Sequence, residues 1–161
     1  MKRYYLHLVW QLALRLSIGF YWLYFASQRW LSVEWVEGLL KTAAEGNYVP
    51  LYGDILRAAV ELEWRSLAWT ITIAETIVGL MIILGILVKV AGATGALIDL
   101  NLLMTFAFCS CPWNENEFPL VFWFYFAPML LNMQLIADRS AEVISVVRLF
   151  RSIPAARVSP S

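Results

Sequence analysis

The strongest architectural signal is the run LAWTITIAETIVGLMIILGILV at residues 67–88, which contains one charged side chain, Glu75. A helix that crosses the hydrocarbon core of a bilayer needs about 20 mostly apolar residues, so this run predicts a membrane-spanning helix. Residues 8–30, 90–109 and 118–137 have the same character and predict three more spans. The sequence therefore predicts an all-α fold, an integral membrane four-helix bundle.

The composition agrees with a membrane protein and leaves room for one domain. The chain has 161 residues, 61% of them hydrophobic, and a mean hydropathy of +0.67, whereas about half of an ordinary soluble domain is apolar. Because four spans occupy most of the chain, we expect residues 1–161 to form a single membrane domain in a lipid bilayer. The basic residues are scattered, which argues against nucleic-acid binding.

Charge is unevenly distributed between the two expected membrane sides. Acidic residues dominate the segment 31–66 and the short loop before the last span, whereas basic residues gather at the chain ends and in the turn between the second and third spans. The basic set is Lys2, Arg3, Lys89, Arg139, Arg148, Arg151 and Arg157. Since basic segments stay in the cytoplasm, we expect a multi-pass protein of the cell (inner) membrane with cytoplasmic N- and C-termini.

Two segments outside the spans have amphipathic patterns. The external segment 31–66 contains two predicted helices separated by the turn-forming residues 46–50. These interfacial helices either cap the bundle or dock a partner. Residues 138–151 predict an inner amphipathic helix, which either anchors to anionic lipid or recognises a partner.

Arg15, Glu75 and Asp99 each interrupt an apolar run. A charge at the centre of a membrane helix costs roughly 2.5–3.5 kcal/mol, so each should have a compensating partner. At about 1.5 Å of rise per residue, Arg15 and Asp99 are nearly level and Glu75 lies about one turn further out. We therefore predict a polar cluster of these three residues, with Asn101 as a further polar residue of the third span.

Three interpretations of this cluster remain open. It can be a buried ion pair that fixes the helix register, or a polar pocket that holds a quinone head group, a proton or a small anion. It can also be a contact to another subunit. The sequence alone does not choose among them.

The aromatic residues and the two cysteines are further candidates. Most aromatic residues lie near span ends, as in interfacial belts, but Tyr21, Trp22 and Tyr24 are also suited to wall a quinone or pigment pocket. Cys109 and Cys111 are ordinary helix-end residues, a redox or intersubunit pair, or part of a metal site. We expect no metal, because a zinc site needs further ligands and the sole histidine is expected on the other side.

Several short motifs, in their order and spacing, resemble the DoxX/DoxD family of four-helix membrane proteins. The motifs are RLSIGF at 15–20, QRW at 28–30, NYVPLY at 47–52, ETIVG at 75–79 and GALIDLNL at 95–102. The resemblance implies a small subunit of the thiosulfate:quinone oxidoreductase type, or one associated with a terminal quinol oxidase. It implies quinone as the ligand, with no covalently bound cofactor.

The chain contains no nucleophile triad, phosphate-binding glycine loop or dinucleotide fingerprint, so we do not expect it to be catalytic alone. The leading hypothesis is an integral membrane subunit of a quinone-linked oxidoreductase or respiratory electron-transfer complex, in contact with other membrane subunits. Two alternatives remain. The chain can be a noncatalytic accessory scaffold of a larger electron-transfer or photosynthetic complex, or a small-solute or proton carrier.

Overall fold

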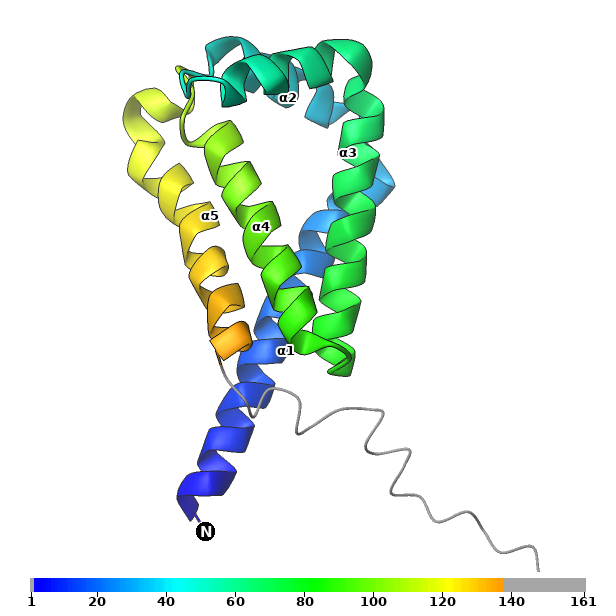
Figure 1. The fold of residues 1–161 in the computed structure, drawn as a ribbon, viewed down its shortest axis with the longest axis vertical. Coiled ribbons are helices and arrows are strands. Elements are labelled where there is room, and N and C mark those ends of the chain that lie inside the picture. The colour runs from blue at the N-terminus through cyan, green and yellow to red at the C-terminus, as the bar shows by residue number, and fades with distance from the viewer. Residues whose placement is uncertain (1, 138–161) are drawn as a thin grey trace, which may run out of the picture.

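The computed structural model describes the backbone of residues 2–137 and the side chains from residue 6 onward, except residue 8 (Figure 1). The described residues form five helices and no β-sheet. The helices are α1 (Lys2–Leu31), α2 (Trp35–Gly46), α3 (Tyr52–Leu84), α4 (Val88–Phe106) and α5 (Asn114–Ala137). The prediction of an all-α fold is confirmed. The predicted amphipathic segment 138–151 lies outside the described residues.

Three helices, α3, α4 and α5, are long and apolar enough to cross a membrane. They contain most of the predicted spans 67–88, 90–109 and 118–137. The predicted span 8–30 lies within α1, which is not among the three, since it carries Arg15 and Arg29 together with many tyrosines and tryptophans. α1 packs along α3, and α4 packs along α5.

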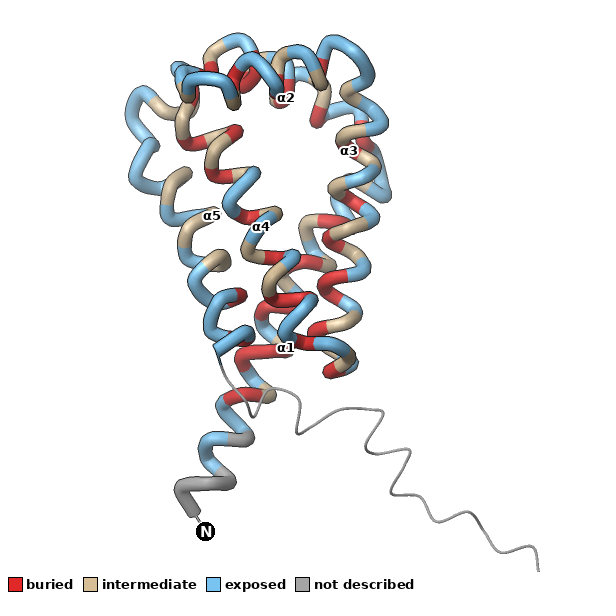
Figure 2. The backbone as a smooth tube through the Cα atoms, viewed as in Figure 1, coloured by how far each residue is buried: buried red, intermediate tan, exposed pale blue. Residues whose placement is uncertain are grey.

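The surface of the bundle is apolar, and α5 shows this most clearly. The residues that α5 buries are Asn132 and Leu135, while Leu120 and Trp123 expose 67% and 57% of their surfaces. Exposed residues follow the outward faces of the long helices in Figure 2. A helix at a water-exposed surface turns its polar side chains outward. α5 buries a polar residue and exposes apolar ones, as a helix in contact with lipid does.

α2 and the first part of α3 lie across one end of the bundle, which we call the cap end (Figure 1). α3 leaves this end at Glu63, whose backbone is non-helical (φ −166°, ψ 77°). The prediction of two helices within residues 31–66 is therefore confirmed, with the second continuing into the next span. A buried apolar cluster joins the cap to the bundle and contains Val33, Val36, Leu40, Ala44, Leu56, Val60 and Ala68.

Glycines set how closely the helices approach. A Cβ on Gly79 would lie 3.0 Å from the carbonyl oxygen of Gly19, so α1 and α3 meet backbone to backbone, as small residues permit in lipid. Gly85 ends α3 in the left-handed conformation (φ 71°), and its amide donates to the carbonyl of Ile82. We call this end of the bundle, with the turn between α3 and α4, the turn end.

Candidate functional site

Glu75 forms an ion pair with Arg29 rather than with Arg15. The side chains of Glu75 and Arg29 are only 1% and 12% exposed, so both charges are removed from solvent. Arg29 Nε also donates to the Thr72 hydroxyl at 2.9 Å, and that hydroxyl donates to the carbonyl of Ala68. The pair therefore has the extra hydrogen bonds that a buried ion pair needs.

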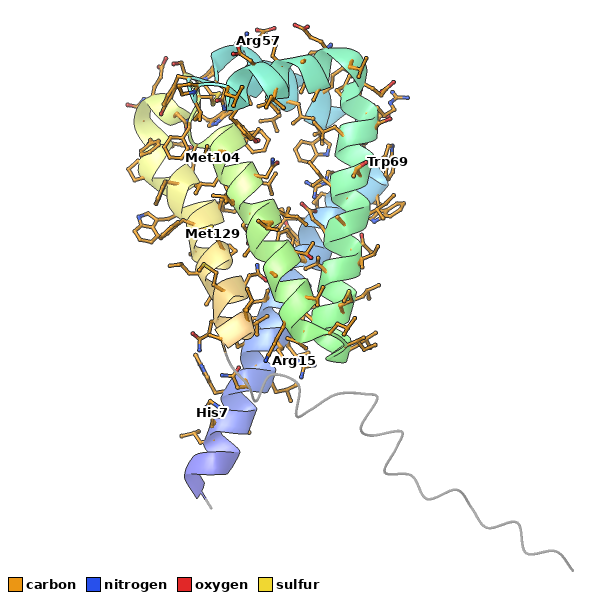
Figure 3. The ribbon with its side chains drawn as sticks, in the orientation of Figure 1. His7, Arg15, Arg57, Trp69, Met104 and Met129 are labelled. Carbon is orange, nitrogen blue, oxygen red and sulfur yellow. A yellow bond between two sulfur atoms is a disulfide. The ribbon has the colours of Figure 1, made fainter. Side chains whose placement is uncertain are left out.

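Arg15 lies at the other end of the bundle, near the end of α3 (Figure 3). Its Nε and Nη2 donate to the carbonyl oxygens of Ile82 and Ile83 at 3.1 and 3.2 Å. Carbonyls in the last turn of a helix lack intrahelical partners and attract cations. Arg15 thus caps α3, and the prediction that it joins Glu75 in one cluster is wrong.

Asp99 is fully buried on α4 and accepts a hydrogen bond from Asn132 Nδ2 at 2.9 Å. Gly95 permits this contact, because a Cβ there would lie 2.7 Å from Asn132 Oδ1. The predicted inclusion of Asn101 is also wrong, since its side chain is exposed. The predicted cluster is therefore divided into a capping arginine, an α4–α5 hydrogen-bonded pair and a separate α1–α3 ion pair.

The sequence analysis missed Arg29, which it assigned to the end of the first span. Two signals identify it in retrospect. A side chain on a helix is tilted toward the helix N-terminus, so a long guanidinium at position 29 extends back toward the middle of α1. The Gly19–Gly79 contact, together with the bonds of Arg15 to Ile82 and Ile83, also shows that α1 runs antiparallel to α3, which brings residues after 19 beside residues before 79.

A cavity of about 310 Å³ adjoins this ion pair, and all five helices contribute to its wall. The wall is mainly aromatic, and besides Arg29 and Glu75 it contains Tyr21, Trp22, Phe25, Trp35, Phe106, Trp113, Phe124 and Tyr125. The volume lies at the lower end of the range of small-molecule sites, about 300–1,000 Å³. The polar residues of the wall are Tyr21 and Arg29 from α1, Glu75 from α3 and Tyr125 from α5, so polar groups of three helices converge here.

The cavity reaches the apolar surface of the bundle. Trp35, Leu120 and Phe124 belong to its wall and are also 49%, 67% and 44% exposed. A residue that is both lining and exposed lies at the mouth of a cavity. Because the surface around α5 is apolar, this mouth suits a molecule that arrives from lipid rather than from water.

Two of the three predicted pocket residues belong to the wall. Tyr21 and Trp22 line the cavity, whereas Tyr24 is 60% exposed and does not. Trp22 is only 1% exposed, and its Nε1 has no hydrogen-bond partner among the described residues. A buried donor without a partner costs about 1–3 kcal/mol, so Trp22 retains a donor that a ligand can use.

The two cysteines lie at the cap end, directly after α4. The structure joins Cys109 to Cys111 by a disulfide, which rules out independent free thiols in this state. Among the described residues, no group of three or more potential ligands is placed to hold a metal ion.

Comparisons of the chain with family models, curated proteins and solved structures gave no match. The functional argument therefore depends on the geometry of the cavity and its ion pair.

Proposed function

We propose that this chain is an integral membrane subunit of a quinone-linked oxidoreductase or respiratory electron-transfer complex, and that it binds the quinone in the cavity beside Arg29 and Glu75. One observation carries the proposal: an aromatic cavity with a buried ion pair in its wall opens on an apolar surface. The quinone hypothesis itself was suggested by the resemblance of the sequence to the DoxX/DoxD family, and the cavity geometry is what carries it here.

The residues present fit a quinone. Its flat ring packs well against aromatic side chains, which favour stacked or edge-to-face contacts. Its two carbonyl oxygens accept hydrogen bonds, for which the remaining N–H groups of Arg29 and the unpartnered Trp22 Nε1 are available. Its apolar tail can leave through the mouth beside Leu120 into lipid.

When bound, a quinone supplies two-electron redox chemistry that also consumes protons. Glu75, Tyr21 and Tyr125 are wall residues whose side chains can exchange a proton. Glu75 is held by Arg29 and has a fixed position, whereas the tyrosines lie on α1 and α5. These residues bind and orient the ring and keep water away from it.

The proposal includes four crossings, with α1 as the fourth. α1 has 30 residues and is thus about 45 Å long, which exceeds the roughly 30 Å hydrocarbon core. Lys89 lies at the turn end, where α1 also begins, while Glu115 and Glu117 begin α5 at the other end. Because basic residues stay inside, we propose that the turn end and both termini are cytoplasmic.

The test measures quinone binding by the full chain in lipid nanodiscs. Trp22, Trp35 and Trp113 belong to the wall, so a short-chain benzoquinone should quench the intrinsic fluorescence in a saturable manner. Arg29→Met should weaken binding by about tenfold or more, because a hydrogen bond to a charged group contributes about 1.5–3 kcal/mol.

Arg57→Met is the matched control for that test. Arg57 is exposed at the cap end and pairs with the exposed Asp54 at 3.4 Å, away from the cavity wall. The Arg57→Met protein should bind the quinone with the affinity of the wild type. Non-saturable quenching that is equal in all three proteins would contradict the proposal, because it reports quinone dissolved in lipid only.

A further inference from the structure

Cys109 and Cys111 are the two cysteines of the chain, and they form one disulfide. They are separated by a single residue and are 3% and 1% exposed. A disulfide restricts the unfolded chain less when the loop that it closes is shorter. This disulfide therefore contributes little to the stability of the fold. Its surroundings suggest a chemical role instead.

One side of the disulfide contacts the wall of the quinone cavity. Phe106 and Trp113 pack against the cluster formed by Ala43, Cys109 and Cys111, and both aromatic residues also line the cavity. Trp113 Nε1 donates to the Phe106 carbonyl at 3.3 Å, which holds the two residues together. A single layer of side chains thus separates the disulfide from the cavity.

The other side of the disulfide faces a second cavity, also of about 310 Å³. Its wall contains both cysteines together with Tyr48, Ser110, Asn114 and Glu115. Tyr48, Ser110 and Glu115 are exposed, so this cavity opens at the cap end. The disulfide lies between an opening at the cap end and the aromatic cavity that opens on the apolar surface.

The surroundings also suit the reduced form. Cys109 Sγ lies 3.5 Å from the Phe106 carbonyl oxygen, and Cys111 Sγ lies 3.9 Å from the Thr42 carbonyl oxygen, so each thiol would have an acceptor. Asn114 Nδ2 lies 3.4 Å from Cys109 Sγ and is placed to donate to a thiolate there. A thiolate is the species that leaves and attacks in thiol–disulfide exchange.

We infer that the Cys109–Cys111 disulfide is a redox site that oxidises thiols at the cap end and passes their electrons to the quinone. This inference rests on the proposed function, because the quinone is the terminal oxidant. A substrate thiolate attacks one of the two sulfurs and releases the other as a thiolate. A second substrate thiol then resolves the mixed disulfide.

After this exchange, oxidation by the quinone regenerates the Cys109–Cys111 disulfide. Cys109 and Cys111 rejoin and lose two electrons and two protons, which a bound quinone would take up and so become the quinol. The sum is two thiols plus one quinone giving one disulfide plus one quinol, so atoms and electrons balance.

The experiment follows the cysteines directly. The full chain in nanodiscs is reduced with dithiothreitol, freed of reductant without oxygen, and mixed with a short-chain benzoquinone. Free thiols are then blocked with a maleimide and counted by intact mass. Since the chain has two cysteines, intact mass distinguishes a re-formed disulfide, which is two hydrogens lighter than the dithiol, from a thiol that has added to the quinone ring. We expect the quinone to abolish maleimide addition to both thiols.

A cavity variant separates oxidation within the bundle from oxidation in solution. Arg29→Met/Glu75→Leu removes the ion pair, and should slow thiol oxidation by the factor of about ten or more by which it weakens quinone binding. Equal oxidation rates in the wild type and a folded variant that has lost binding would overturn the inference.

Quinone binding is measured on the same samples. If the wild type binds the quinone but its thiols still take up maleimide, the redox inference is overturned while the proposed function stands. If the quinone does not bind, both are overturned. Cys109→Ser/Cys111→Ser should bind the quinone as the wild type does, while dithiothreitol-dependent quinol formation falls to the background of empty nanodiscs.

Discussion

The two arginines of α1 are both largely shielded from solvent, and they lie at different places in the bundle. Arg15 donates to main-chain carbonyls in the last turn of α3, at 3.1 and 3.2 Å, and lies outside the cavity wall. Arg29 pairs with Glu75 and lines the cavity. The difference teaches that a charge inside an apolar bundle marks a site when it lies beside its partner in the wall of a cavity, whereas a charge that caps a helix outside that wall supports the architecture.

The largest expected effect follows from removing one member of the ion pair. Arg29→Met leaves the Glu75 carboxylate buried without its cation, which typically costs about 3–5 kcal/mol. Arg29→Met/Glu75→Leu should recover most of that loss, because an apolar pair can replace a buried ion pair at little cost. Thermal unfolding followed by circular dichroism checks both. A single variant as stable as the wild type would show that the pair is not buried as described.

The next effect concerns the α4–α5 contact. Gly95→Ala places a methyl group 2.7 Å from Asn132 Oδ1 and should disturb its hydrogen bond to Asp99. Overpacking of this kind costs about 1–3 kcal/mol. Gly38→Ala is the matched control, because a Cβ there meets nothing within 4 Å.

In the interior of an exposed helix, the Gly38→Ala change should stabilise by roughly 0.5–1 kcal/mol. We therefore expect Gly95→Ala to lower the melting temperature and Gly38→Ala to raise it. A Gly95→Ala protein that melts at or above the wild-type temperature would contradict the close approach of α4 and α5.

Arg15→Met should have a smaller effect on stability and none on quinone binding. A cation at a helix C-terminus contributes about 0.3–2 kcal/mol, so the melting temperature should fall modestly. Quinone affinity should remain that of the wild type, measured by fluorescence quenching. Loss of binding with an unchanged melting temperature would reverse the roles that we assign to the two arginines.

The smallest effects on quinone binding are expected from Trp22 and Tyr24, two of the aromatic residues predicted to wall a pocket. Trp22→Phe removes the unpartnered Nε1 donor and should weaken quinone binding by up to about tenfold, since a neutral hydrogen bond contributes about 0.5–1.5 kcal/mol. Tyr24→Phe should change nothing, because Tyr24 is exposed and lies outside the wall. Equal losses in both variants would point to a general effect of the α1 surface.

Hydrophobic pattern was sufficient to predict the all-α fold and three helices long and apolar enough to cross a membrane, α3, α4 and α5. Length and apolarity are properties of a local run, so they can be seen without knowing any neighbour. The two cap helices were predicted from another local signal, the amphipathic spacing within residues 31–66. α3 continues from the cap into its span at Glu63, which no local pattern indicated.

The site was predicted less well, because partners depend on helix register and tilt. Glu75 was identified correctly as a charge that needs compensation, but depth counting assigned Arg15 to it instead of Arg29. Straight, parallel helices were assumed, and the reach of an arginine side chain toward its helix N-terminus was not included. Asn132 was missed because an amide within an apolar run gives no signal as strong as a charge.

The central claim is that the Arg29–Glu75 pair belongs to a quinone site, and the most direct measurement is the affinity of the folded Arg29→Met/Glu75→Leu protein for a short-chain benzoquinone in nanodiscs. If the pair belongs to the site, affinity should fall by about tenfold or more while the melting temperature stays near that of the wild type. Wild-type affinity in this protein would contradict the claim and leave the pair as a structural contact between α1 and α3.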